Sequence, residues 1–130
     1  MNNISEFIGK VINGDCLEIM PRIPSNSIYL ILVDLPYGIT SQNTWDHIIP
    51  LEPLWNEYSR LIKENGVIVL TAQGKFSAQL IMSSKVKYQY SMVWCKPNHT
   101  NQLNAKKQPL RKHEDILVFY NKQPVYNPQG

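Results

Sequence analysis

A carboxylate and an aromatic ring lie three residues apart at the end of an apolar run. Residues 28–33 are apolar or aromatic without a polar break, and the run stops at Asp34. A short run rich in β-branched residues, bounded by turn formers, predicts a strand buried on both faces, as in a parallel sheet. Asp34 would then lie at the carboxyl end of the strand, where open α/β sheets bind their ligands. There, Asp34 could accept a hydrogen bond from a flat substrate while Tyr37 stacks on it.

The tetrapeptide Asp34-Leu35-Pro36-Tyr37 resembles the Asp-Pro-Pro-Tyr signature of amino-directed DNA methyltransferases, in a variant that some phage and prophage members carry. By itself, this tetrapeptide is better interpreted as a strand end followed by a proline turn. Four further blocks favour the resemblance, because they follow the order of the circularly permuted class whose catalytic motif lies near the N-terminus. These blocks are Gly14-Asp15-Cys16-Leu17, Trp45-Asp46, Gly66-Val67-Ile68-Val69-Leu70-Thr71 and Asn104-Ala105-Lys106-Lys107-Gln108-Pro109-Leu110-Arg111.

The resemblance implies a Rossmann-like α/β methyltransferase fold, incomplete here, with a parallel centre and an antiparallel edge hairpin. It also implies site-specific methylation of adenine N6 in double-stranded DNA, as in restriction-modification systems, because the signature begins with aspartate. The Asp34 side chain and the Leu35 backbone carbonyl would accept the two hydrogens of the amine. Tyr37 would stack on a base extruded from the duplex, and Pro36 would hold the turn. Cytosine C5 chemistry would need a cysteine after a proline, which neither cysteine provides.

The implied methyl donor is S-adenosylmethionine. In the resembled family the residue matching Asp15 binds the adenine amino group of this cofactor, with Cys16 beside it and Asp34 close by. Asp15 also precedes a short predicted helix, and aspartate is a favoured N-cap residue. The capping role and the cofactor role are compatible, and both stay open.

The family's Phe-x-Gly-x-Gly and His-Pro-x-Gln-Lys-Pro segments do not occur among the 130 residues. The resemblance therefore implies a catalytic half without its glycine-rich cofactor cradle. We expect a truncated prophage product or one half of a split enzyme, completed by a C-terminal half or assembled as a homodimer. The alternatives are a non-catalytic remnant that binds nucleic acid and, less favoured, an N-methyltransferase of a protein or a small amine.

Length and composition predict one domain over residues 1–130, and the resemblance implies that it is a partial methyltransferase catalytic domain. The chain is 43% hydrophobic, and its apolar runs are shorter than the ~20 residues that span a bilayer. The N-terminus lacks the features of a secretory signal, so a cytoplasmic protein with no membrane partner is expected. Cys16 and Cys95 are far apart in the sequence and are expected to be reduced, and no metal-ligand spacing is present.

Basic residues gather in a predicted loop over residues 96–113. Residues 96–112 hold five basic residues and no acidic one, whereas the whole chain carries a net charge of only +3. Such a segment suits contact with DNA phosphates, although a solvated loop explains the charge equally well. The phosphate-contact candidates are Lys106, Lys107, Arg111 and Lys112. His113-Glu114 and the three tryptophans Trp45, Trp55 and Trp94 are interpreted as structural.

Strands and helices are predicted to alternate, which is typical of an α/β sheet. The helix over residues 50–64 should bury Leu54, Trp55 and Tyr58 and end at Asn65-Gly66, with glycine in the left-handed position. The other predicted elements are a strand at 10–13, a helical turn at 16–22, strands at 67–70, 88–94 and 116–120, a helix at 76–85 and a tail at 121–130.

Overall fold

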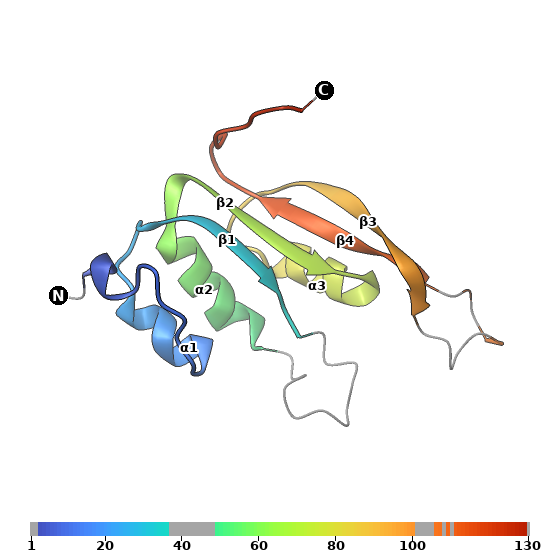
Figure 1. Ribbon diagram of the computed structural model, residues 1–130, viewed down its shortest axis with the longest axis horizontal. Helices are drawn as coiled ribbons and strands as arrows, with labels where there is room; N and C mark the ends of the chain where they lie inside the picture. Colours follow the sequence, from blue (N-terminus) through green and yellow to red (C-terminus); the bar gives the residue numbers. More distant parts are fainter. Residues whose placement is uncertain (1–2, 37–48, 101–105, 108, 110, 130) are drawn as a thin grey trace.

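The computed structural model describes residues 3–36, 49–100, 106, 107, 109 and 111–129 (Figure 1). Within these residues the structure has the following helices and strands: η1 (Ile4–Glu6), α1 (Cys16–Ile19), η2 (Met20–Arg22), β1 (Ile28–Asp34), α2 (Leu51–Leu61), β2 (Ile62–Ala72), α3 (Gly74–Ser83), β3 (Tyr88–Thr100) and β4 (Arg111–Phe119). No helix in these described segments is long and apolar enough to cross a bilayer.

The four strands form one mixed sheet in the order β1-β2-β4-β3. β1 and β2 are parallel and are joined through α2, whereas β4 is antiparallel to both β2 and β3. The predicted α/β class, with a parallel pair and an antiparallel hairpin at the edge, is therefore confirmed. β4, the last of the described strands along the chain, lies inside the sheet rather than at its edge.

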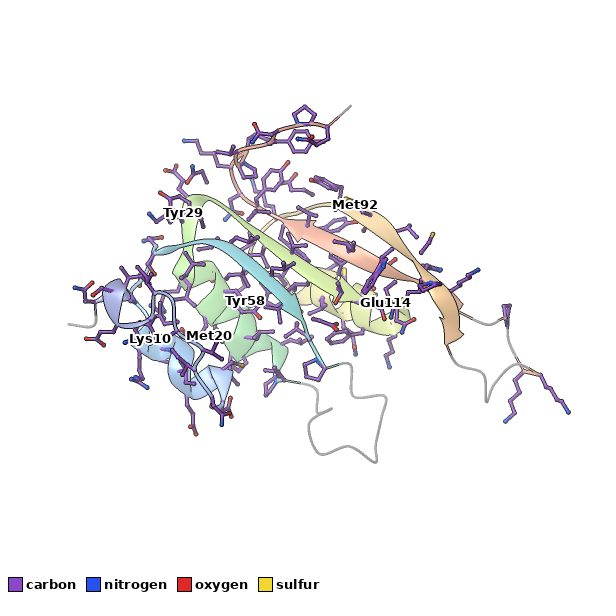
Figure 2. The ribbon with its side chains drawn as sticks, in the orientation of Figure 1. Lys10, Met20, Tyr29, Tyr58, Met92 and Glu114 are labelled. Atoms are coloured by element: carbon purple, nitrogen blue, oxygen red, sulfur yellow. The ribbon has the colours of Figure 1, made fainter. Side chains whose placement is uncertain are left out.

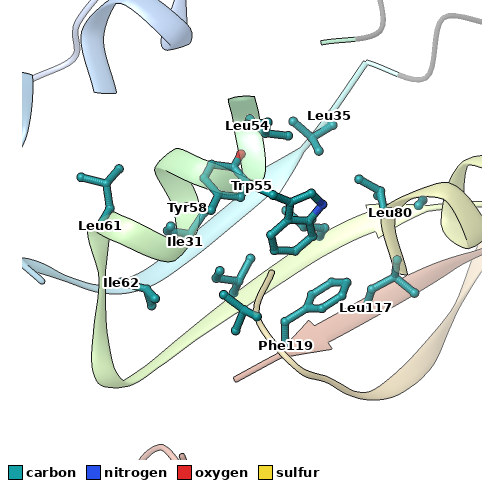
Figure 3. Packing of buried hydrophobic residues seen from close by; sticks show 14 of the residues in the cluster. Ile31, Leu35, Leu54, Trp55, Tyr58, Leu61, Ile62, Leu80, Leu117 and Phe119 are labelled. Atoms are coloured by element: carbon teal, nitrogen blue, oxygen red, sulfur yellow. The ribbon is translucent and has the colours of Figure 1, made fainter. Parts of the chain in front are cut away.

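The core forms where α2 packs on the sheet (Figure 3). Leu54, Trp55 and Tyr58 are buried on the predicted face of this helix, and Pro53 lies in its first turn, where a missing N–H does no harm. The Trp55 ring lies edge-on to the Phe119 ring, with 4.8 Å between their centroids. The helical periodicity therefore predicted the buried face of α2 correctly.

Burial of β1 on both faces was predicted, and this is wrong. Ile31 is buried, but Leu30 is 52% exposed and Leu32 is 66% exposed. The reason is that α1, α2 and α3 lie on one side of the sheet, and among the described strands β1 pairs with β2 alone (Figure 1). The uninterrupted apolar run therefore has one covered face and one uncovered face.

The helix predicted over residues 50–64 ends earlier, at Leu61, because the chain enters the sheet at Ile62, which pairs with Ile28. The register then shifts before Leu30 pairs with Val67, so residues 63–66 form an irregularity in β2. Gly66 does not have the positive φ of a helix terminus. Glycine fits here for another reason, because the backbone at residue 66 passes close to the Tyr29 carbonyl of β1.

Replacing Gly66 by alanine should destabilise the fold by about 1–3 kcal/mol, because the added methyl group overpacks this crossing. A Cβ atom at Gly66 would lie 2.7 Å from Cγ1 of Ile62 and 3.0 Å from the carbonyl oxygen of Tyr29. Urea denaturation measures the change in unfolding free energy. The control is Asn65→Ala at the exposed neighbouring position, which should stay within about 0.5 kcal/mol of the parent. Equal stability of the two variants would contradict the overpacking.

Two other predictions also differ from the structure. Residues 10–13 form no strand, and Val11 is fully exposed, because no strand of the described sheet lies beside this segment. The connection between the last two strands is shorter than predicted, because β3 continues to Thr100 and β4 begins at Arg111, with which Thr100 pairs. The helical turn at 16–22 is confirmed as α1 followed by η2.

Candidate active site

Asp34 is the last residue of β1, and its side chain is exposed at the carboxyl end of the strand. The register places Thr71 of β2 beside it, and the Thr71 hydroxyl donates a hydrogen bond of 2.6 Å to Oδ1 of Asp34. This bond holds the carboxylate at the sheet edge and leaves Oδ2 as a further acceptor. Sequence reasoning gave Thr71 no role, because the strand register that pairs it with Asp34 is not visible in the sequence.

Leu35 and Pro36 follow Asp34 at the same end of the sheet. The Leu35 side chain is buried and anchors the turn, while Pro36 is half-buried. Tyr37 and Trp45-Asp46, which were predicted to lie close by, are outside the described residues. The carboxylate and the first half of the turn are therefore where the motif predicts them.

Asp15 caps α1, as predicted. Its Oδ1 accepts a hydrogen bond of 2.9 Å from the Leu17 backbone N–H, and its side chain is exposed. The cap satisfies one of the backbone donors that the first turn of a helix leaves free. This bond occupies Oδ1 and leaves Oδ2 as a further acceptor, so the cap does not exclude a second contact.

An apolar groove of about 440 Å³ connects these two segments. Cys16 and Met20 line one side, Leu35 and Pro36 line the end of β1, and Tyr58 closes the groove from α2. Apart from the Cys16 thiol, the Tyr58 phenol and the Met20 thioether, its lining side chains are hydrocarbon. The groove therefore suits apolar polypeptide or a flat ring and does not suit a charged group.

Burial raises the pKa of the Cys16 thiol, and the Asp15 carboxylate raises it further. Burial also raises the pKa of the Tyr58 phenol, with a smaller contribution from Cys16. Both groups are therefore neutral at physiological pH, in keeping with the apolar lining of the groove.

Asp15→Asn should speed the alkylation of Cys16 by iodoacetamide at pH 8. The substitution removes the carboxylate charge that raises the pKa of the Cys16 thiol, so more of the thiol is ionised. The gain should be less than about tenfold, since burial is the larger cause and remains. Asparagine is also a good N-cap, so α1 is retained. Mass spectrometry of the two cysteine peptides measures both rates, and exposed Cys95 is the internal control. An unchanged ratio of Cys16 to Cys95 labelling would mean that the Asp15 charge does not act on this thiol.

The basic residues lie on the β3–β4 hairpin, beyond the ends of β1 and β2. Thr71 pairs with Ile116, so the residues of β4 that precede Ile116 extend past the row that contains Asp34. Lys106, Lys107 and Lys112 are exposed, whereas Arg111 is described only as the first residue of β4. Lys96, by contrast, forms an ion pair with buried Glu114.

The proteins that are similar to this chain are DNA methyltransferases. No family model matches the chain. The Type II methyltransferase M.HinfI of Haemophilus influenzae is 29% identical over a stretch that covers 47% of this chain and 18% of that protein. Among solved structures, M1.HpyAVI in complex with SAM matches with a TM-score of 0.65 at 19% identity, covering 89% of this chain and 58% of that one.

The cytosine-N4-specific PvuII DNA methyltransferase also matches, with a TM-score of 0.60 at 15% identity, covering 85% of this chain and 49% of that chain. At this level of identity, the likeness to both solved structures concerns the fold. The chain thus spans about half the length of these two solved relatives, and it has the α/β fold of the part that it matches.

Proposed function

We propose that this chain is the catalytic part of a site-specific DNA methyltransferase that transfers a methyl group from S-adenosylmethionine to adenine N6. The observation that carries the proposal is the exposed Asp34 at the carboxyl end of β1, followed by the anchored Leu35-Pro36 turn. The same fold occurs in M1.HpyAVI, which was solved with SAM, and M.HinfI is a Type II methyltransferase.

The chemistry requires few groups from this chain. The exocyclic amine of adenine is a poor nucleophile because its lone pair is delocalised into the ring. The Asp34 carboxylate and the Leu35 carbonyl each accept a hydrogen bond from one N–H of the amine and favour the geometry in which its lone pair is free. S-adenosylmethionine would supply the methyl group from its sulfonium and leave as a neutral thioether, and the methylated amine would lose one proton to solvent. Tyr37 stacks on the extruded base and holds the amine in line.

S-adenosylmethionine supplies an activated methyl group, and the described residues fit this cofactor only in part. Asp15 would accept a hydrogen bond from its adenine amino group, with Cys16 beside it and Asp34 near the transferred methyl. The charged amino and carboxylate groups of the cofactor would find no charged partner among the side chains that line the groove beside β1. The methionine end therefore requires residues other than those that line the groove.

Labelled S-adenosylmethionine and duplex DNA test the proposal. The assay uses the chain alone and the chain mixed with the portion of M1.HpyAVI that it does not match, expressed as a separate polypeptide. Nucleoside mass spectrometry should find N6-methyladenine in at least one preparation, and none with the M1.HpyAVI portion alone. Label on cytosine N4, as in the PvuII relative, would overturn the adenine assignment. No labelled base in either preparation would overturn the proposed activity.

Binding to double-stranded DNA should depend on the hairpin lysines. Changing Lys106, Lys107 and Lys112 to glutamine should reduce the slope of log affinity against log salt by up to roughly three, because each phosphate contact contributes about 0.9. Fluorescence anisotropy with a labelled duplex measures the slope. The matched control changes three exposed lysines elsewhere, Lys10, Lys85 and Lys87, and should leave the slope unchanged.

An unchanged slope in the hairpin variant would contradict the phosphate contacts. Salt-dependent DNA binding without any binding of S-adenosylmethionine in either preparation would favour the second candidate, a nucleic-acid-binding remnant. The exposed lysines of the hairpin are the observation that keeps this candidate open.

A further inference from the structure

Thr71 is held from both sides at the carboxyl end of β2. It pairs with Asp34 of β1 on one side and with Ile116 of β4 on the other. Figure 2 labels Met92 on β3, at the far end of the same row. The residues directly before and after Thr71 are fully buried, and a β-branched side chain has few preferred χ1 angles. The Thr71 hydroxyl therefore has a fixed position before any substrate binds.

The hydrogen bond between Thr71 and Asp34 has one direction when the carboxylate is ionised. An ionised carboxylate has acceptors alone, so the Thr71 hydroxyl donates and Oδ1 of Asp34 accepts, at 2.6 Å. This distance is typical of a hydroxyl that is bonded to a charged oxygen, which is the stronger kind of hydrogen bond. The bond therefore joins a rigid donor to a charged acceptor.

The Asp34 side chain has little other restraint in the part of the chain that the structure describes. It is exposed, and the Thr71 hydroxyl is the donor that reaches its carboxylate there. In water, both torsions of an aspartate side chain interconvert, because χ1 has three staggered wells and χ2 is broad. Without the hydroxyl, solvent would surround both carboxylate oxygens, and neither would be directed at a particular place.

A carboxylate that turns freely is a poor acceptor for the proposed reaction. One N–H of the amine donates to Asp34 and the other to the Leu35 carbonyl, and both acceptors must be in place as the amine changes its geometry. The Leu35 carbonyl belongs to the backbone, and the Leu35 side chain is buried, so this acceptor is fixed. The orientation of the second acceptor, Asp34, has to come from Thr71.

We propose that Thr71 is a positioning residue that holds Oδ1 of Asp34 and thereby directs Oδ2 at the exocyclic amine of the target base. The inference rests on the proposed function and adds a residue to it. Thr71 takes no proton and acts through Asp34 alone. Its removal should therefore affect the rate of methylation and not the stability of the fold.

A second bond between a hydroxyl and a carboxylate provides the matched control. The Ser77 hydroxyl on α3 donates to Oδ2 of Asp115 on β4, also at 2.6 Å. Asp115 pairs with Ala72, the residue after Thr71, so the two bonds lie in adjacent rows of the sheet. Side chains alternate along a strand, so the Ser77 bond lies on the opposite face, where it ties α3 to the sheet away from Asp34.

Thr71→Val keeps the shape and the strand preference of threonine and removes the hydroxyl. In any active preparation we expect it to lower the single-turnover rate of adenine methylation roughly tenfold, with unchanged DNA affinity and an unchanged urea midpoint. Thr71→Ser keeps the donor and should restore most of the lost rate. Ser77→Ala should have the opposite effect, because it should lower the urea midpoint and leave the rate of the folded protein unchanged.

The Asp34→Ala background separates positioning from any other role of Thr71. Thr71→Val should cause no further loss of rate there, because no carboxylate remains to be oriented. The same loss in that background would overturn the inference, and so would full activity of Thr71→Val when Asp34 is present. A slow Thr71→Val enzyme that Thr71→Ser does not improve on would also overturn it.

NMR of the chain alone tests the orientation without any reaction. Three-bond couplings to the Asp34 β-protons should show one rotamer in the parent and in Thr71→Ser, and an average over rotamers in Thr71→Val. Averaged couplings in the parent would overturn the inference. A single rotamer that Thr71→Val releases, in a chain that methylates no base in any preparation, would support the orientation and count against the proposed function. The two proposals therefore fail separately.

Discussion

Replacing Asp34 by alanine should lower the rate of adenine methylation by a factor of roughly 100 to 1,000 in any preparation of this chain that is active. The reason is that the side chain provides one of two acceptors that release the lone pair of the amine. Because Asp34 is exposed and lies at the end of β1, the replacement should leave the fold intact. Single-turnover transfer of label to duplex DNA measures the rate, and circular dichroism checks the fold.

The matched control for Asp34 is Glu64→Gln, which also removes a carboxylate. The Glu64 side chain is 81% exposed and forms only an exposed ion pair with Lys122, so methylation should be unchanged. DNA affinity of Asp34→Ala should also stay close to that of the parent. Full activity of Asp34→Ala would remove this residue from the proposed mechanism.

Trp55→Ala should destabilise the fold by about 3–5 kcal/mol, a large part of the total stability of a domain of this size. Trp55 is fully buried between α2 and the sheet, with its ring against Tyr58 and Phe119. Removing the indole leaves a cavity that these neighbours fill only partly. Chemical denaturation followed by circular dichroism measures the loss.

Trp94→Ala provides the control with the same change of side chain. Trp94 is 45% exposed on β3, where Lys96 lies over its ring, so its removal should destabilise the fold by less than about 1.5 kcal/mol. An equal loss in both variants would mean that the core is not organised around Trp55.

Features set by local patterns could be predicted from the sequence. The apolar run before Asp34 gave β1 and its carboxyl end, the helical spacing of Leu54, Trp55 and Tyr58 gave the buried face of α2, and Asp15 gave a cap. Each depends on residues that are close in the sequence. The predicted mixed sheet followed from the alternation of these local elements and from the resemblance.

Features set by distant residues could not be predicted in the same way. Whether Leu30 and Leu32 are buried depends on which layers cover β1, and an apolar run alone does not show this. The early end of α2 follows from the pairing of Ile62 with Ile28. The hydrogen bond between Thr71 and Asp34, 37 positions apart, likewise depends on the register between two strands.

The position of β4 has a consequence for how the chain is made on the ribosome. β2 and β3 are not neighbours in the sheet, and β4, which lies between them, is synthesised after both. Until residues 111–119 have been translated, β3 has no partner strand, and Phe119 is not available to close the core against Trp55. The nascent chain can therefore form the β1–α2–β2 unit early, but the described sheet only after Phe119 has emerged.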